Sequence, residues 1–121
     1  MSEKKILIVD DDKSITTVYK MILEEQGYNV HTASSGKEAI SFTEPSYDLV
    51  ILDIKLPDIM GDQVAKVMKE RRMADNIVLM TGYPDLGDCI DTLSIGIQEI
   101  LIKPISPDEI LRVAREALSK K

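Results

Sequence analysis

The 121-residue chain has the length of one ordinary domain, and its composition, 44% hydrophobic and 30% charged, is that of a globular protein and not of a disordered or fibrous one. The formal net charge of −6 argues against general nucleic-acid binding, which requires Lys and Arg gathered along one face. No apolar run approaches the roughly 20 residues of a membrane-spanning helix, and the N-terminus lacks a signal-peptide pattern. We therefore expect a single cytoplasmic domain over residues 1–121 that binds neither nucleic acid nor membrane.

A single cysteine and a single histidine leave no internal disulfide and no thiolate or imidazole metal cluster. Cys89 has apolar neighbours at helical spacing, Leu86, Ile90 and Leu93, so we expect it to pack in the interior. We expect His31, which has no partner ligand nearby in the sequence, to be an ordinary strand residue.

Short apolar runs alternate with helical patterns along the whole chain. Five runs are predicted as strands: residues 6–9, 30–33, 49–52, 77–80 and 100–102. All but the second are continuously apolar, as strands covered on both faces are. The alternation is typical of a parallel sheet wrapped by helices.

The first three helical patterns follow the first three strands. The first has apolar residues at helical spacing, and Gly27 ends it: Ile15, Val18, Tyr19, Ile22 and Leu23. The second begins with Ser35 and Glu38 at capping-box spacing and should end before Pro45. The third follows Gly61. Its expected buried residues are Val64, Val67 and Met68.

The last two helices differ in how clearly they are marked. We expect a mobile fourth helix over residues 85–94, because Gly87 costs about 1 kcal/mol relative to Ala. The last helix has Ser106 as its N-cap, Pro107 at its first position and Glu109 at capping-box spacing. Its inward-facing residues are predicted to be Ile110, Val113, Ala114, Ala117 and Leu118. The order is therefore an α/β fold of five βα units.

Polar side chains follow the predicted strands at the point where each strand ends. They are Asp10 with Asp11 and Asp12, then Asp53, Thr81 and Lys103. Because the carboxyl ends of parallel strands share one edge of the sheet, these groups should meet where such sheets bind ligands. Taken alone, Asp10 or Asp12 is better explained as a helix cap. Asp53 is not, because the loop it opens leads to no immediate helix start.

Carboxylates gathered at one edge repel one another, and at neutral pH a cation compensates them more readily than protonation does. We predict Mg²⁺ bound among these carboxylates, with Ca²⁺ and Mn²⁺ left open. A carboxylate beside Mg²⁺ is a competent nucleophile toward a phosphoryl group, so Asp53 is the predicted acceptor. Lys103 would hold the added negative charge, and the Thr81 hydroxyl would bond a phosphoryl oxygen.

These residues resemble the receiver domain of bacterial response regulators, the CheY-like superfamily, and the resemblance runs from Ile6-Leu7-Ile8-Val9-Asp10-Asp11 to Ile102-Lys103-Pro104 and the closing helix. The segment Asp53-Ile54-Lys55-Leu56-Pro57, with Gly61, is similar to the family's acceptor loop. By this resemblance Asp53 is the phosphoacceptor, and Asp10 and Asp11 are metal ligands. Thr81 is the switch hydroxyl, and Lys103 contacts the phosphate.

The resemblance also implies a flavodoxin-like three-layer (βα)5 sandwich with a five-stranded parallel sheet in the order 2-1-3-4-5, and a cis Lys103–Pro104 peptide. It implies Mg²⁺-dependent phosphoryl transfer from a sensor histidine kinase or phosphotransfer protein, slow self-dephosphorylation, and control of a downstream protein or output domain. Such a domain is not an enzyme, because it promotes only its own phosphorylation and dephosphorylation.

Three residues depart from the family pattern. Ile100 stands where many receivers carry an aromatic residue that turns inward when the hydroxyl moves. Lys55 sits where the family tunes hydrolysis of the acyl phosphate, placed either to pair with Asp58 or to lean over the site. Tyr83 is bulky for its position and either substitutes for the missing aromatic residue or simply packs.

Three other functions compete with that of a phosphoaccepting receiver. An aspartate-nucleophile phosphatase would place a second Asp where Lys55 stands, and a nucleotide-binding enzyme would need a glycine-rich turn after the first strand. The runner-up is a degenerate, phosphorylation-independent receiver that acts as a protein-protein interaction module.

Charges near the last two helices leave the oligomeric state open. Acidic residues flank the fourth helix: Asp85, Asp88, Asp91 and Glu99. Basic residues belong to the last helix: Arg112, Arg115, Lys120 and Lys121. These charges form either a solvated surface or pairs between subunits of a homodimer that forms on phosphorylation.

Overall fold

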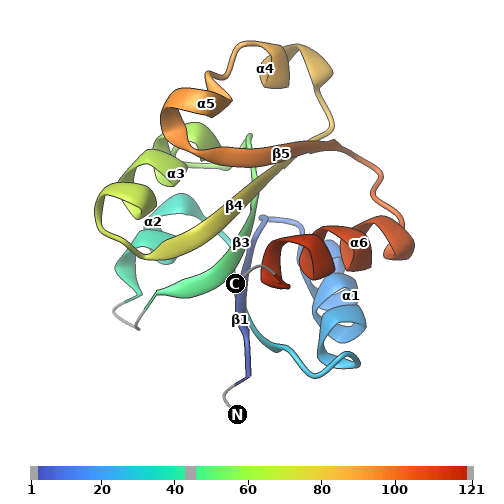
Figure 1. Cartoon of the computed structure of the whole chain (residues 1–121). Helices are drawn as coiled ribbons and strands as arrows, with labels where there is room; N and C mark the ends of the chain where they lie inside the picture. The colour runs from blue at the N-terminus through green and yellow to red at the C-terminus, as the bar shows by residue number, and fades with distance from the viewer. Residues whose placement is uncertain (1–2, 43–45, 120–121) are drawn as a thin grey trace.

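The computed structural model describes residues 3–42 and 46–119, in which strands and helices alternate (Figure 1). The strands are β1 (Lys5–Val9), β2 (Asn29–Ala33), β3 (Tyr47–Asp53), β4 (Ala74–Thr81) and β5 (Ile97–Ile102). The helices are α1 (Lys13–Glu24), α2 (Gly36–Ser41), α3 (Gly61–Glu70), α4 (Pro84–Asp88), α5 (Thr92–Ile95) and α6 (Pro107–Leu118). Pro45, Lys120 and Lys121 lie outside the described residues.

The strands pair in parallel in the order β2-β1-β3-β4-β5, which confirms the predicted flavodoxin-like sheet. Helices α1 and α6 lie on one face, and α2, α3 and α5 lie on the other (Figure 1). Ile6 and Ile8 of β1 join the first core, and the alternating Leu7 and Val9 join the second. The central strands are continuously apolar because both of their faces are covered.

Helix caps follow the sequence closely. The Ser35 hydroxyl accepts from the Glu38 N–H at 3.1 Å, and the Ser106 hydroxyl accepts from the Glu109 N–H at 3.1 Å. Asp12 caps α1 by accepting from the Ser14 N–H at 3.0 Å, which settles that residue as a cap. All five residues predicted to face inward from α6 are buried.

The predicted fourth helix is where the structure differs most from the expectation. Residues 85–94 form the two short helices α4 and α5, because Asp91 accepts hydrogen bonds from the N–H and hydroxyl of Ser94 and so starts a new helix. Cys89 lies between the two helices and is exposed, so its predicted burial is wrong. Val67, also expected to be buried, is half-buried.

Other local features agree with the sequence. His31 is a strand residue of β2, and the Lys103–Pro104 peptide is cis. Across the ranges 3–42 and 46–119, every helix is too short or too polar to cross a lipid bilayer.

Candidate functional site

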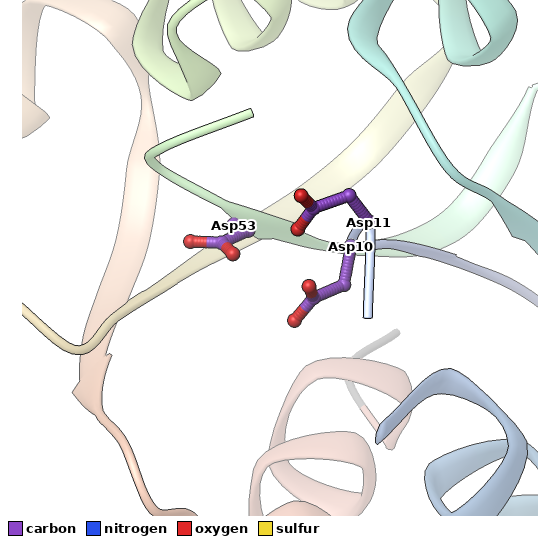
Figure 2. Close-up of side chains that lie close together, drawn as sticks. All are labelled: Asp10, Asp11 and Asp53. Atoms are coloured by element: carbon purple, nitrogen blue, oxygen red, sulfur yellow. The ribbon is translucent and has the colours of Figure 1, made fainter. Parts of the chain in front are cut away.

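The predicted site residues meet at the carboxyl ends of four strands. Asp10 directly follows β1, Asp53 ends β3, Thr81 ends β4 and Lys103 directly follows β5. Figure 2 shows Asp10, Asp11 and Asp53 projecting to the same side of the sheet from the ends of β1 and β3. The parallel topology thus brings together residues from four separate segments, as the strand ends predicted.

The three carboxylates form a cluster of oxygen ligands. One carboxylate oxygen from each of Asp10, Asp11 and Asp53 lies within 4.8 Å of the others. Asp10 and Asp53 are buried and Asp11 is exposed, so the cluster opens to water. Hard oxygen donors with access to water suit Mg²⁺, which keeps part of its hydration shell. The residues present therefore fit the predicted ion.

Lys103 bridges two of these carboxylates. Its Nζ donates to Asp10 Oδ2 at 2.7 Å and to Asp53 Oδ2 at 2.9 Å. Burial acts to lower the pKa of Lys103, but the hydrogen bonds and charges of the two carboxylates outweigh it and raise that pKa above its ordinary value. The ammonium group is therefore charged throughout the neutral range, and it compensates part of the negative charge of the three carboxylates.

Backbone contacts fix where Lys103 stands. Its N–H donates to the Thr81 carbonyl at 2.7 Å, which ties the end of β5 to the end of β4. On the following turn, the Tyr19 hydroxyl of α1 donates to the Ile105 carbonyl at 3.4 Å. Lys103 is thus held from both sides of its turn.

The segment after Asp53 folds back tightly on the strand. Asp53 Oδ1 accepts from the Lys55 N–H at 3.2 Å, and Lys55 forms an isolated antiparallel bridge with Met60. The Gly61 N–H donates to the Ile54 carbonyl at 2.6 Å. A Cβ on Gly61 would lie 2.2 Å from the Asp53 carbonyl oxygen, so this close approach admits only glycine.

Thr81 is fully buried, and its hydroxyl is occupied by the backbone of Tyr83. It accepts from the Tyr83 N–H at 2.8 Å and donates to the Tyr83 carbonyl at 3.2 Å. The hydroxyl must give up at least part of this arrangement to reach a group bound at Asp53.

The three departures from the family pattern take distinct positions. Lys55 leans over the site, with its Nζ 4.9 Å from the centroid of the Tyr83 ring, and both residues line the cleft. Asp58, the other partner considered for Lys55, instead accepts hydrogen bonds from backbone N–H groups. Tyr83 is 55% exposed, so it does not pack as a core residue. Ile100 is half-buried against the core on the α3 face.

The charges considered for a dimer are partly used within the chain. Arg112 of α6 donates to Glu99 of β5 at 2.7 Å and to Glu116 at 2.9 Å. Hydrogen bonds and charge from Glu99 raise the pKa of Arg112 above its usual value. An ion pair between Arg112 and a second subunit would therefore replace these contacts within the chain and would not add to them.

Sequence reasoning missed part of the cleft wall and one long-range contact. Leu56, Pro57 and Gly82 also line the cleft, and only their place in the loops after β3 and β4 indicated it. Asp58 binds amides 22 and 21 positions away, at Gly36 and Lys37. No local pattern in the sequence signals such a contact.

Comparison with known proteins gives the family. The model described as "Response regulator receiver domain" matches residues 6–115, so the chain belongs to the response regulator receiver domain family. It is therefore the receiver domain of a two-component response regulator, with the CheY-like fold.

Curated relatives are longer than this chain. It is 38% identical over 108 residues to the alkaline phosphatase synthesis transcriptional regulatory protein PhoP of Bacillus subtilis, which covers 88% of this chain and 45% of PhoP. It is 35% identical over 106 residues to the response regulator SaeR of Staphylococcus aureus, which covers 88% of this chain and 46% of SaeR. The chain thus spans less than half the length of these relatives.

Solved structures match along nearly the whole chain. A CheY-like receiver domain protein from Methanospirillum hungatei JF-1 superposes with a TM-score of 0.85 at 34% identity, covering 98% of this chain and 95% of that one. The response regulator TrrA from Thermotoga maritima, solved in complex with Mg(2+)-BeF, gives a TM-score of 0.81 at 36% identity, covering 95% and 99%.

Proposed function

We propose that Asp53 accepts a phosphoryl group from a histidine kinase or a phosphotransfer protein in an Mg²⁺-dependent reaction, and that the product changes the surface that controls a downstream protein or output domain. The observation that carries the proposal is the single cluster formed by Asp53, Asp10, Asp11 and the ammonium group of Lys103. Family membership supports the same reading.

The reaction is a transfer between two nucleophiles. An oxygen of Asp53 forms a bond to phosphorus as the bond between phosphorus and the donor's imidazole nitrogen breaks, and that nitrogen keeps the electron pair. Mg²⁺, held by Asp10, Asp11 and Asp53, would neutralise charge on the phosphoryl oxygens. Lys103 already stands 2.9 Å from Asp53 Oδ2 and supplies a fixed positive charge without reorganisation.

Thr81 offers a way to report the reaction. A phosphoryl group on Asp53 brings acceptor oxygens to the edge where the Thr81 hydroxyl now bonds the backbone of Tyr83. When the hydroxyl turns to a phosphoryl oxygen, Tyr83 loses its contact at the start of α4. The segment from Tyr83 through α5 is then free to rearrange.

We assign the domain the role of a signalling phosphoacceptor, not of an enzyme, because its only reactions would be on its own Asp53. The intact cluster speaks against a degenerate receiver that merely binds a partner. The net charge of −6 supports the proposal that any nucleic-acid contact of a longer protein lies outside this domain. The cytoplasm is the proposed location. Homodimerisation on phosphorylation stays a prediction.

Intact mass tests the proposal. The protein is incubated with Mg²⁺ and acetyl phosphate, in parallel with Asp53→Asn and with Asp62→Asn, a control in the first turn of α3. We expect one added phosphoryl group on the wild type and on Asp62→Asn, none on Asp53→Asn, and none on any of them with EDTA. Equal labelling of Asp53→Asn would contradict the proposal, and absence of labelling throughout would favour the binding module.

A further inference from the structure

The tip of the acceptor loop is tied to a helix from another part of the chain. Asp58 Oδ1 accepts from the Gly36 N–H at 2.9 Å, and Oδ2 accepts from the Lys37 N–H at 2.9 Å. Oδ1 also accepts from the Ile59 N–H at 2.9 Å. The loop that begins at Asp53 thus supplies partners for the first two amides of α2, which the helix itself leaves unbonded.

Packing at this junction leaves little room for movement. Gly36 is buried, and a Cβ there would lie 2.8 Å from Val64 Cγ2 and 3.2 Å from Ile59 Cβ. Hydrogen bonds from the backbone, that of Lys37 the largest, lower the pKa of Asp58 below its ordinary value. The carboxylate is therefore ionised across the neutral range, and the contact persists there.

The base of the same loop is held separately. The Gly61 N–H bonds the Ile54 carbonyl, and Lys55 bridges Met60, so the two ends of the loop meet at the strand. Leu56 and Pro57, which line the cleft together with Lys55, lie between this closed base and Asp58. The tether at Asp58 is thus what fixes the far end of the cleft wall.

We propose that Asp58 is a positioning residue for the phosphoacceptor site, which holds residues 55–57 in place against the cleft by binding the first amides of α2. The inference rests on the proposed function of Asp53. Asp58 acts through the loop, and the three hydrogen bonds of its carboxylate go to backbone amides. Because coupling between two sites is reciprocal, occupation of the cleft should in turn protect the amides of Gly36 and Lys37.

The test compares two ways of weakening the same helix end. Asp58→Ala removes the cap that comes from the loop, whereas Ser35→Ala removes the cap that α2 takes from its own segment, the bond to the Glu38 N–H. We expect both variants to lower the unfolding midpoint by similar amounts. Only Asp58→Ala should weaken binding of Mg²⁺, by roughly tenfold, because only this variant lets residues 55–57 shift away from the cleft. Amide chemical shifts of the wild type and both variants follow the titration.

A conservative variant and hydrogen exchange keep the outcomes distinct. Asp58→Asn retains one acceptor oxygen and loses the other, so it should weaken Mg²⁺ binding less than Asp58→Ala does but more than Ser35→Ala does. This partial loss is the readout if Asp58→Ala does not fold. In the wild type, Mg²⁺ with fluoroberyllate should slow exchange of the Gly36 and Lys37 amides, and Asp58→Ala should lose this protection.

Two results would overturn the inference: Mg²⁺ affinity unchanged in Asp58→Ala, or affinity reduced equally in Ser35→Ala. Either would leave Asp58 as a cap of α2 alone. Failure of the proposed function appears separately, as a wild type that binds Mg²⁺ but takes no phosphoryl group. The Mg²⁺ titration still decides the role of Asp58 in that case.

Discussion

The half of the carboxyl edge that holds the carboxylates is built differently from the half that follows Thr81. Around Asp53, backbone bonds join separate segments: the Ile54 N–H donates to the Met80 carbonyl at 2.9 Å, and the Gly61 N–H donates to the Ile54 carbonyl at 2.6 Å. Beyond Thr81 the chain passes through α4 and α5, helices of five and four residues without a buried residue between them. The half around Asp53 is therefore bonded tightly to neighbouring segments, whereas the half beyond Thr81 packs only loosely against the rest of the domain.

The difference fits the two tasks of a switch. Phosphoryl transfer requires carboxylates and an ammonium group at fixed separations, which a buried framework provides. A change of surface requires a segment whose opening costs little free energy, and few buried contacts mean a low cost. Leu93 is 92% exposed and Tyr83 is 55% exposed, so this half carries apolar surface whose arrangement phosphorylation could change. We expect it to move this half and to leave the carboxylate half nearly unchanged.

Glycine substitutions in the two halves should give the largest contrast. Gly61→Ala places a Cβ 2.2 Å from the Asp53 carbonyl oxygen, so we expect a loss of about 3 kcal/mol in unfolding free energy and a severe loss of phosphorylation. Gly87→Ala places a Cβ 3.4 Å from Ile100 Cγ2 and should change stability by no more than about 1 kcal/mol. Urea unfolding measures both. Similar values for the two variants would remove the contrast.

Removal of the Lys103 ammonium should have the next largest effect. Lys103→Met leaves the buried carboxylates of Asp10 and Asp53 without their shared partner, so we expect a loss of about 3 kcal/mol in the absence of metal. Added Mg²⁺ should restore more stability to this variant than to the wild type, because the ion takes over the compensation. Thermal unfolding with and without Mg²⁺ checks this. Lys37→Met, at an exposed position, serves as the control and should respond as the wild type does.

Substitution of Thr81 should have a small effect on stability and a selective effect on signalling. Thr81→Ala loses the hydrogen bonds to the Tyr83 backbone, for a cost of about 1 kcal/mol. Thr81→Ala should still accept a phosphoryl group. The changes in amide chemical shift that phosphorylation causes over residues 82–96 should be smaller than in the wild type. Thr81→Ser, which keeps the hydroxyl, should restore those changes. A full response in Thr81→Ala would show that the movement of this half does not depend on the hydroxyl.

Much of this arrangement was predictable from local sequence. The runs 49–52 and 77–80 are continuously apolar, so parallel strands covered on both faces were the natural expectation. Because the carboxyl ends of such strands share one edge, Asp53 and Lys103 could be placed together although 50 residues separate them.

The features that escaped prediction depend on competition or on tertiary contact. Asp91 and Ser94 form a local cap that competes with a continuous helix, and apolar spacing alone does not reveal which arrangement wins, so Cys89 was misplaced. The tether at Asp58 joins residues that only the folded chain brings together. The contact between the Lys55 ammonium group and the Tyr83 ring escaped prediction for the same reason.

The most direct test of the central claim is to locate the phosphoryl group on the chain. After incubation with Mg²⁺ and acetyl phosphate, borohydride reduction converts an aspartyl phosphate to homoserine, which peptide mass spectrometry then places. We predict homoserine at position 53 alone, and only in the sample with Mg²⁺. Homoserine at Asp10 or Asp11, or at no position despite bound Mg²⁺, would contradict the assignment of Asp53 as the phosphoacceptor.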